Sequence, residues 1–119
     1  MSGLGFGRVI PKLQKFVPYN GKIADITEAD TNKHFLDLET ALSETRKIIA
    51  VQLHQTLVAG ADDLYAYPNE GTEKTWIYAR SLGVANWIII ADGTQRLQYS
   101  LETANDDFDV YCIGYVVEA

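Results

Sequence analysis

Apolar and polar residues alternate with a period of two along most of this chain, and turn-forming residues interrupt the alternation every few positions. Because successive side chains of a β-strand point to opposite faces of its sheet, this period is typical of strands that bury one face. The clearest case is the segment 94–103, where Leu97, Tyr99 and Leu101 alternate with polar residues. The longest is 47–57, in which frequent β-branched residues favour a strand over a helix. The pattern predicts strands throughout and no long helix.

An Asp92-Gly93 pair between two apolar runs predicts a hairpin, and a helical turn is expected at 41–46. The expected strands are 23–27, 34–40, 47–57, 63–68, 75–82, 85–91, 94–103 and 107–118. The predicted fold is all-β, an antiparallel, jelly-roll-like β-sandwich of about eight strands, the number found in a jelly roll. Its predicted core consists of Ile49, Val51, Leu53, Ile77, Ile89, Leu97, Tyr99, Leu101, Val110 and Cys112.

The last strand, 107–118, is apolar on both sides from Val110 onward. One predicted face carries Phe108, Val110, Cys112, Gly114 and Val116. An antiparallel strand with one wet face should instead have a polar side. The opposite face is therefore predicted to be an interface that needs cover from another protein or a second copy, through Tyr111, Ile113, Tyr115 and Val117.

Residues 1–21 are predicted to form an extended N-terminal arm ahead of a sandwich domain at 22–119. Its glycines and prolines disfavour regular structure, yet its apolar residues are too numerous for a solvated tail. We expect the arm to cross to an adjacent subunit. Its predicted interface residues are Leu4, Phe6, Arg8, Val9, Ile10, Lys12, Leu13, Phe16 and Val17.

Charge supports docking of the arm on protein. The chain has 119 residues, a length typical of one domain. It contains 10 basic and 16 acidic residues, and its first 22 residues include four of the bases and none of the acids. A basic arm therefore precedes an acidic body, which would repel a nucleic acid. No apolar run is typical of a signal peptide or long enough to span a membrane, so neither membrane nor nucleic acid is an expected partner.

No catalytic residue, metal ligand or cofactor is predicted. Cys112, the only cysteine, falls within an apolar strand and is expected to be a buried structural residue. His34 and His54 lack partners at metal-ligand spacing. The acidic segment 105–109 suggests calcium, but it lacks the spacing and glycine of an EF-hand and equally fits a turn.

Aromatic residues leave one alternative open. The aromatic residues that could form the sugar-binding platform of a carbohydrate-binding or receptor-binding module are Tyr65, Tyr67, Trp76, Tyr78 and Trp87, with Tyr67, Trp76 and Tyr78 as the candidate site residues. Aromatic residues are also frequent in cores and subunit interfaces, which is the favoured interpretation.

Three segments carry a resemblance to a known group of proteins: 47–53 (Lys-Ile-Ile-Ala-Val-Gln-Leu), 67–71 (Tyr-Pro-Asn-Glu-Gly) and 109–115 (Asp-Val-Tyr-Cys-Ile-Gly-Tyr). With the arm and the acidic sandwich, the pattern resembles the small β-sandwich virion proteins of tailed bacteriophages, which decorate capsids or associate with tails. The resemblance implies a non-enzymatic, homo-oligomeric protein, often a trimer, bound to a protein shell in the virion.

Overall fold

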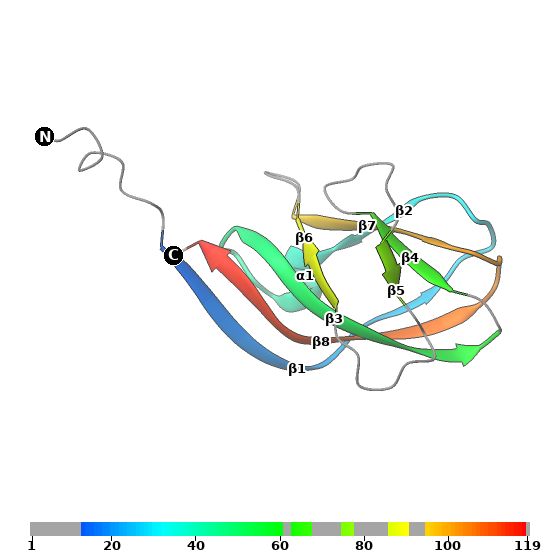
Figure 1. Cartoon of the computed structure of the whole chain (residues 1–119), viewed down its shortest axis with the longest axis horizontal. Helices are drawn as coiled ribbons and strands as arrows, with labels where there is room; N and C mark the ends of the chain where they lie inside the picture. Colours follow the sequence, from blue (N-terminus) through cyan, green and yellow to red (C-terminus); the bar gives the residue numbers. More distant parts are fainter. Residues whose placement is uncertain (1–12, 61–62, 68–74, 78–85, 91–94, 119) are drawn as a thin grey trace, which may run out of the picture.

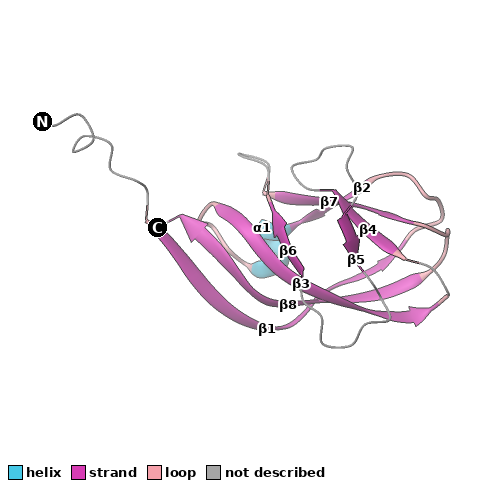
Figure 2. Ribbon diagram, viewed as in Figure 1, coloured by secondary structure: helices cyan, strands magenta, loops and turns pink. Residues whose placement is uncertain are grey.

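The computed structural model describes residues 13–60, 63–67, 75–77, 86–90 and 95–118. The described chain is all-β, as predicted, apart from one short helix, and its strands form two antiparallel sheets (Figures 1 and 2).

The first sheet has the strand order β1-β8-β3-β6. Its strands are β1 (Gln14–Thr27), β8 (Asp107–Glu118), β3 (Ile48–Ala59) and β6 (Asn86–Ile89). The second sheet has the order β2-β7-β4-β5. Its strands are β2 (His34–Asp37), β7 (Arg96–Leu101), β4 (Leu64–Tyr67) and β5 (Thr75–Ile77).

The two sheets share one buried apolar core, to which both contribute. Seven of the predicted core residues are buried: Val51, Leu53, Leu97, Tyr99, Leu101, Val110 and Cys112. Two predictions were wrong by one position, because Ile48 and Ile88 are buried whereas Ile49 is half-buried and Ile89 is exposed. The side chain of Ile77 lies outside the described residues.

A β-bulge at Ile113 explains why the last strand is apolar on both sides. Cys112 lies opposite Leu53 of β3, and Gly114 lies opposite the adjacent residue Gln52, so Ile113 is an extra residue with no partner on β3. A bulge of this kind moves the following residues to the opposite face.

The bulge overturns part of the predicted interface. Val110 is buried before the bulge, whereas Tyr115 and Val117 are buried after it and Val116 is only half-buried. Tyr115 and Val117 therefore belong to the core of their own domain. The sequence-based prediction placed Tyr115 and Val117 on the face opposite to that of Val110, because it assumed strict alternation along the strand, with no extra residue.

Tyr115 is also tied to the loop before β3. Its hydroxyl donates to Oε1 of Glu44 at 2.9 Å, and the Arg46 guanidinium donates to both oxygens of the same carboxylate at 2.9 and 3.0 Å. The hydrogen bonds from Arg46 are the main reason why the pKa of Glu44 falls to about 2. Burial, aided by Glu44, raises the pKa of Tyr115 to about 12.

Strand β1 begins within the range predicted as an arm. It starts at Gln14, which pairs with Glu118, and continues through the boundary predicted after residue 21 to Thr27. Residues 14–21 are thus an edge strand of their own domain. Residues 1–12 of the predicted arm lie outside the described residues.

Two local predictions were also wrong. The strands on either side of Asp92-Gly93 do not form a hairpin, because β6 pairs with β3 and β7 pairs with β2 and β4 in the other sheet. Helix α1 spans Leu38–Leu42, earlier than the predicted turn at 41–46. The Asp37 side chain caps it by accepting from the Thr40 backbone N–H, so β2 ends at Asp37 instead of continuing to residue 40.

Candidate interaction surface

The outer face of the first sheet, which points away from the core, carries two adjacent rows of side chains that cross all four strands. Strand pairing aligns the first row as Phe16, Val116, Ala50 and Ile89. It aligns the second row as Pro18, Gly114, Gln52 and Trp87. Directly paired residues of neighbouring strands present their side chains on the same face, so these rows form one surface.

Large apolar side chains on this surface are about half exposed: Phe16 by 48%, Trp87 by 47% and Ile89 by 52%. Ile113, at the bulge, is exposed too. We call these residues, together with Val116, the outer apolar surface. Apolar residues that gather in this way, unlike scattered ones, mark interaction sites.

Gly114 shapes the middle of the outer apolar surface. The Phe16 ring lies where a side chain at position 114 would be, in contact with the glycine backbone. From there Phe16 meets Trp87 in an edge-on arrangement, with 6.2 Å between ring centroids. Two aromatic rings from the two edge strands of the sheet thus meet above its middle strands, which fixes their positions.

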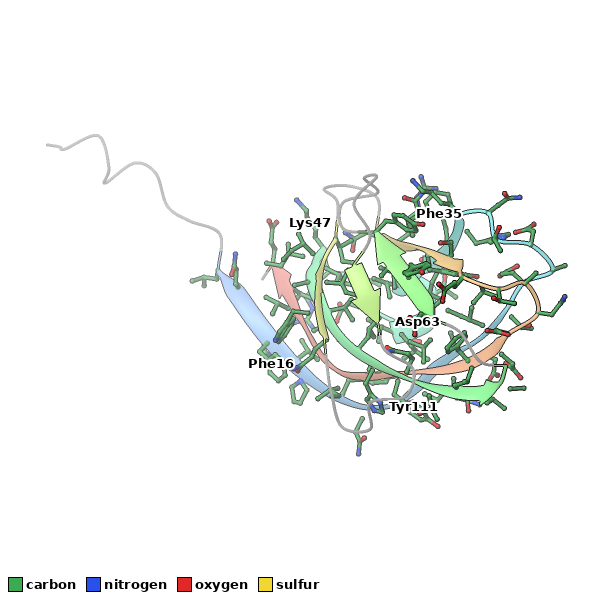
Figure 3. The ribbon with its side chains drawn as sticks, turned by 45° about the vertical axis from the view of Figure 1, so that its right-hand side comes forward. Phe16, Phe35, Lys47, Asp63 and Tyr111 are labelled. Carbon is green, nitrogen blue, oxygen red and sulfur yellow. The ribbon has the colours of Figure 1, made fainter. Side chains whose placement is uncertain are left out.

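The other half of the same outer face is polar. The Lys22 ammonium lies 2.9 Å from the Asp25 carboxylate and 3.7 Å from that of Asp109. The rings of His54 and Tyr111 stack with 5.0 Å between centroids. One outer face therefore combines an apolar half with a charged half, and Figure 3 shows Phe16 and Tyr111 along this side and Phe35 on the other side of the molecule.

The structure brings together only some of the predicted interface residues. Phe16 and Ile113 lie on the outer apolar surface, and Tyr111 lies on the polar half. Leu13 is exposed just before β1, and Val17 packs against the core. The other predicted arm residues are outside the described part of the chain: Leu4, Phe6, Arg8, Val9, Ile10 and Lys12.

Sequence reasoning missed Ile89 and Gly114 as surface residues, and it named Trp87 only as a candidate for a sugar-binding platform. It predicted a nearly continuous apolar strand at 85–91 with Ile89 in the core, whereas Trp87 and Ile89 point outward and Ile88 and Ile90 point inward. The alternation of large residues in this run was the available signal, but it does not reveal which side faces the core.

Among the predicted platform aromatics that the structure describes with their side chains, Trp87 is exposed on the outer apolar surface and Tyr65 is buried. Tyr67 is buried, its hydroxyl lies 2.7 Å from the Ser100 hydroxyl, and the Lys33 ammonium lies 4.4 Å above its ring centroid. Trp76 lies in β5, paired with Tyr65, but its side chain is outside the described residues, as is all of Tyr78.

A separate polar cluster ties the segment 28–33 to β7. His34 Nε2 lies 2.8 Å from Asp30 Oδ1, and His34 Nδ1 lies 3.6 Å from Glu28 Oε1. Glu28 also accepts a hydrogen bond of 2.5 Å from the Tyr99 hydroxyl, whose ring stacks on His34. The hydrogen bond that His34 donates to Asp30 raises the pKa of His34 above its usual value, and Glu28 contributes to the rise.

This cluster predicts a pH-dependent stability. Because the pKa of His34 is raised by folding, its contribution is fully present below the unfolded pKa of about 6.5 and is lost as pH rises through the folded value. Thermal unfolding midpoints measured from pH 5.5 to 8.5 should fall more for the wild type than for His34→Gln. Equal pH dependence in the two proteins would show that His34 makes no such contribution.

Other candidate chemistry is structural in this geometry. Cys112 is buried, as predicted, and burial raises the pKa of its thiol to about 11, which disfavours the reactive thiolate. In the described part of the chain, no three His, Cys, Asp or Glu side chains gather as a metal site would require. Nor does any helix there have the length and apolar character to cross a membrane.

Comparisons with protein-family models, with curated protein sequences and with solved structures found no match for this chain.

Proposed function

We propose that this chain is a non-enzymatic structural virion protein, a homo-oligomeric subunit that decorates a capsid or associates with a tail and acts through protein–protein interfaces. The observation that carries this proposal is the outer apolar surface. About half of the surface of the Phe16 and Trp87 side chains is exposed to water, although aromatic residues are enriched where proteins bind one another. A second protein covering them would recover that apolar burial.

Strand order supports the finer interpretation as a jelly-roll sandwich. Within the sheets β1 pairs with β8, β2 with β7, β3 with β6 and β4 with β5. The first strand thus pairs with the last, the second with the seventh, and so on towards the middle of the chain. This is the pairing that results when one long antiparallel hairpin rolls up into two sheets. Jelly rolls are common in viral capsid domains and in lectins, so the fold is compatible with the proposal and does not by itself decide it.

Self-association of the purified full chain tests the proposal. Sedimentation velocity should reveal oligomers that dissociate on dilution, and a monomer at every accessible concentration would contradict a homo-oligomer. The virion location is tested by the position of the gene, which should lie beside capsid or tail genes.

A carbohydrate-binding module is the second candidate. Trp87 favours it, because an exposed indole ring is able to stack on the apolar face of a sugar. A glycan array followed by calorimetric titration distinguishes the two: specific binding that is lost in Trp87→Ala would favour recognition of a glycan over assembly.

A further inference from the structure

The size of the outer apolar surface limits what can cover it. Its four strands span about 14 Å between the outermost strand axes, and its two rows are about 7 Å apart along the strands. With side chains the surface covers on the order of 300 Å², whereas a stable interface buries about 800 Å² on each partner. Face-to-face packing of two copies through this surface alone is therefore too small. A short extended segment fits it, because five extended residues span about 17 Å.

The chain contains such a segment. In the run Gly3-Leu4-Gly5-Phe6-Gly7, an extended backbone would place Leu4 and Phe6 on one side and only glycines on the other. The segment would then be a thin strip with one apolar side. Glycine on the opposite side leaves no second apolar face that needs cover, and it allows close approach of the backbone.

We propose that Leu4 and Phe6 of one copy bind the outer apolar surface of a neighbouring copy. This inference rests on the proposed homo-oligomer and names the contact that holds it together. Each copy offers one segment and receives one, so several such exchanges add up to the area that a single surface lacks.

The sequence between the segment and β1 favours a neighbour over the chain's own surface. Phe16 of the first row lies only ten residues after Phe6, so binding to its own sheet would require the chain to reverse within residues 7–15. Gly7 and Pro11 are the only residues typical of turns in this stretch. Binding to a neighbouring copy requires no such reversal.

Charge fits the same arrangement. Arg8 would lie on the same side of an extended segment as Leu4 and Phe6, about 13 Å beyond Leu4. On the polar half of the outer face, beside the apolar half, Lys22 lies next to Asp25 and Asp109, and Asp107 follows on the same face of β8, so acids outnumber the base. The Asp25 carboxylate is 67% exposed and faces solvent. A cation arriving from a neighbour would reduce this excess of acidic groups.

The edge of the sheet is a poorer docking site than its face. The edge strand β1 contains Pro18, which lacks an N–H, and two register shifts, after Pro18 and after Lys22. Proline and bulges are features by which proteins prevent further strands from pairing with an edge. The neighbour's segment is therefore expected on the face.

Mixing of two variants of the full chain tests the proposal. Phe6→Ser removes the segment's main side chain, and Phe16→Ser removes its binding surface. Each change should raise the dissociation constant of assembly about tenfold to a hundredfold in sedimentation velocity. The two variants mixed should associate more tightly than either variant does alone, because one retains an intact surface and the other an intact segment. The matched control is Phe35→Ser, since Phe35 is similarly exposed, by 44%, on β2 of the other sheet.

The outcomes separate this inference from the proposed function. A wild type that stays monomeric overturns both. A wild type that assembles, with Phe6→Ser or Phe16→Ser assembling equally well, overturns only the segment exchange, as does a mixture that associates no more tightly than either variant alone. A labelled peptide of residues 1–12 gives a second readout: it should bind the Phe6→Ser chain and not the Phe6→Ser/Phe16→Ser double variant.

Discussion

Deletion of Ile113 should leave the domain folded. Ile113 is the extra residue of the bulge, so without it Cys112, Gly114 and Tyr115 pair with Leu53, Gln52 and Val51 as before, and no side chain changes face. Tyr115 and Val117 would stay in the core. Had the deletion turned both side chains out of the core, the loss of their burial would cost about 3–6 kcal/mol, which is a large part of the stability of a domain of this size.

The matched control is Ile113→Ser. It keeps the extra residue, and the side chain that it shortens is exposed, so the free energy of unfolding should change by less than about 0.5 kcal/mol. Urea unfolding followed by circular dichroism compares the two proteins. The two proteins should be similarly stable, and a deletion variant less stable than Ile113→Ser by about 3–6 kcal/mol would show that the bulge residue itself is needed to place Tyr115 and Val117 in the core.

Replacement of Gln55 by methionine should stabilise the domain. Gln55 lies on the core side of β3 and is only 3% exposed. Neither polar atom of its amide has a hydrogen-bond partner in the described part of the chain. An unsatisfied buried polar group costs about 1–3 kcal/mol, and a side chain of similar length without polar atoms removes that cost.

Urea unfolding should therefore give Gln55→Met a free energy of unfolding about 1–3 kcal/mol above that of the wild type. Gln14→Met is the control, because the same chemical change at an exposed position of β1 should leave stability unchanged. Destabilisation by Gln55→Met would mean that the amide is satisfied and contributes to the fold.

The sequence predicts the regular strands of this fold better than its irregular positions. The inward side of β7 follows from alternation alone, because Leu97, Tyr99 and Leu101 have polar neighbours. The bulge at Ile113 was not predictable in this way. Large apolar residues surround it on both sides, so no polar residue marks the change of face, and register depends on the partner strand. Non-local pairing also decided that β6 and β7 lie in different sheets.

The candidate site was predicted only in part, for the same reason. Phe16 and Ile113 were expected at an interface because they are apolar residues without obvious cover. Trp87 joins them only through the pairing of β6 with β3, a contact between residues far apart in the sequence. Gly114 belongs to the site only because the Phe16 ring of β1 lies against it across the β1–β8 pair. The local sequence around Trp87 or Gly114 contains no pattern that would predict either contact.

Hydroxyl-radical footprinting of the full chain tests the central claim most directly, because it reports which side chains assembly covers. Comparison of dilute monomer with concentrated oligomer should show Phe16 and Trp87 losing reactivity while Phe35, similarly exposed on the other sheet, keeps it. Oligomers in which Phe16 and Trp87 react as strongly as in the monomer would contradict the assignment of the outer apolar surface as the site of assembly.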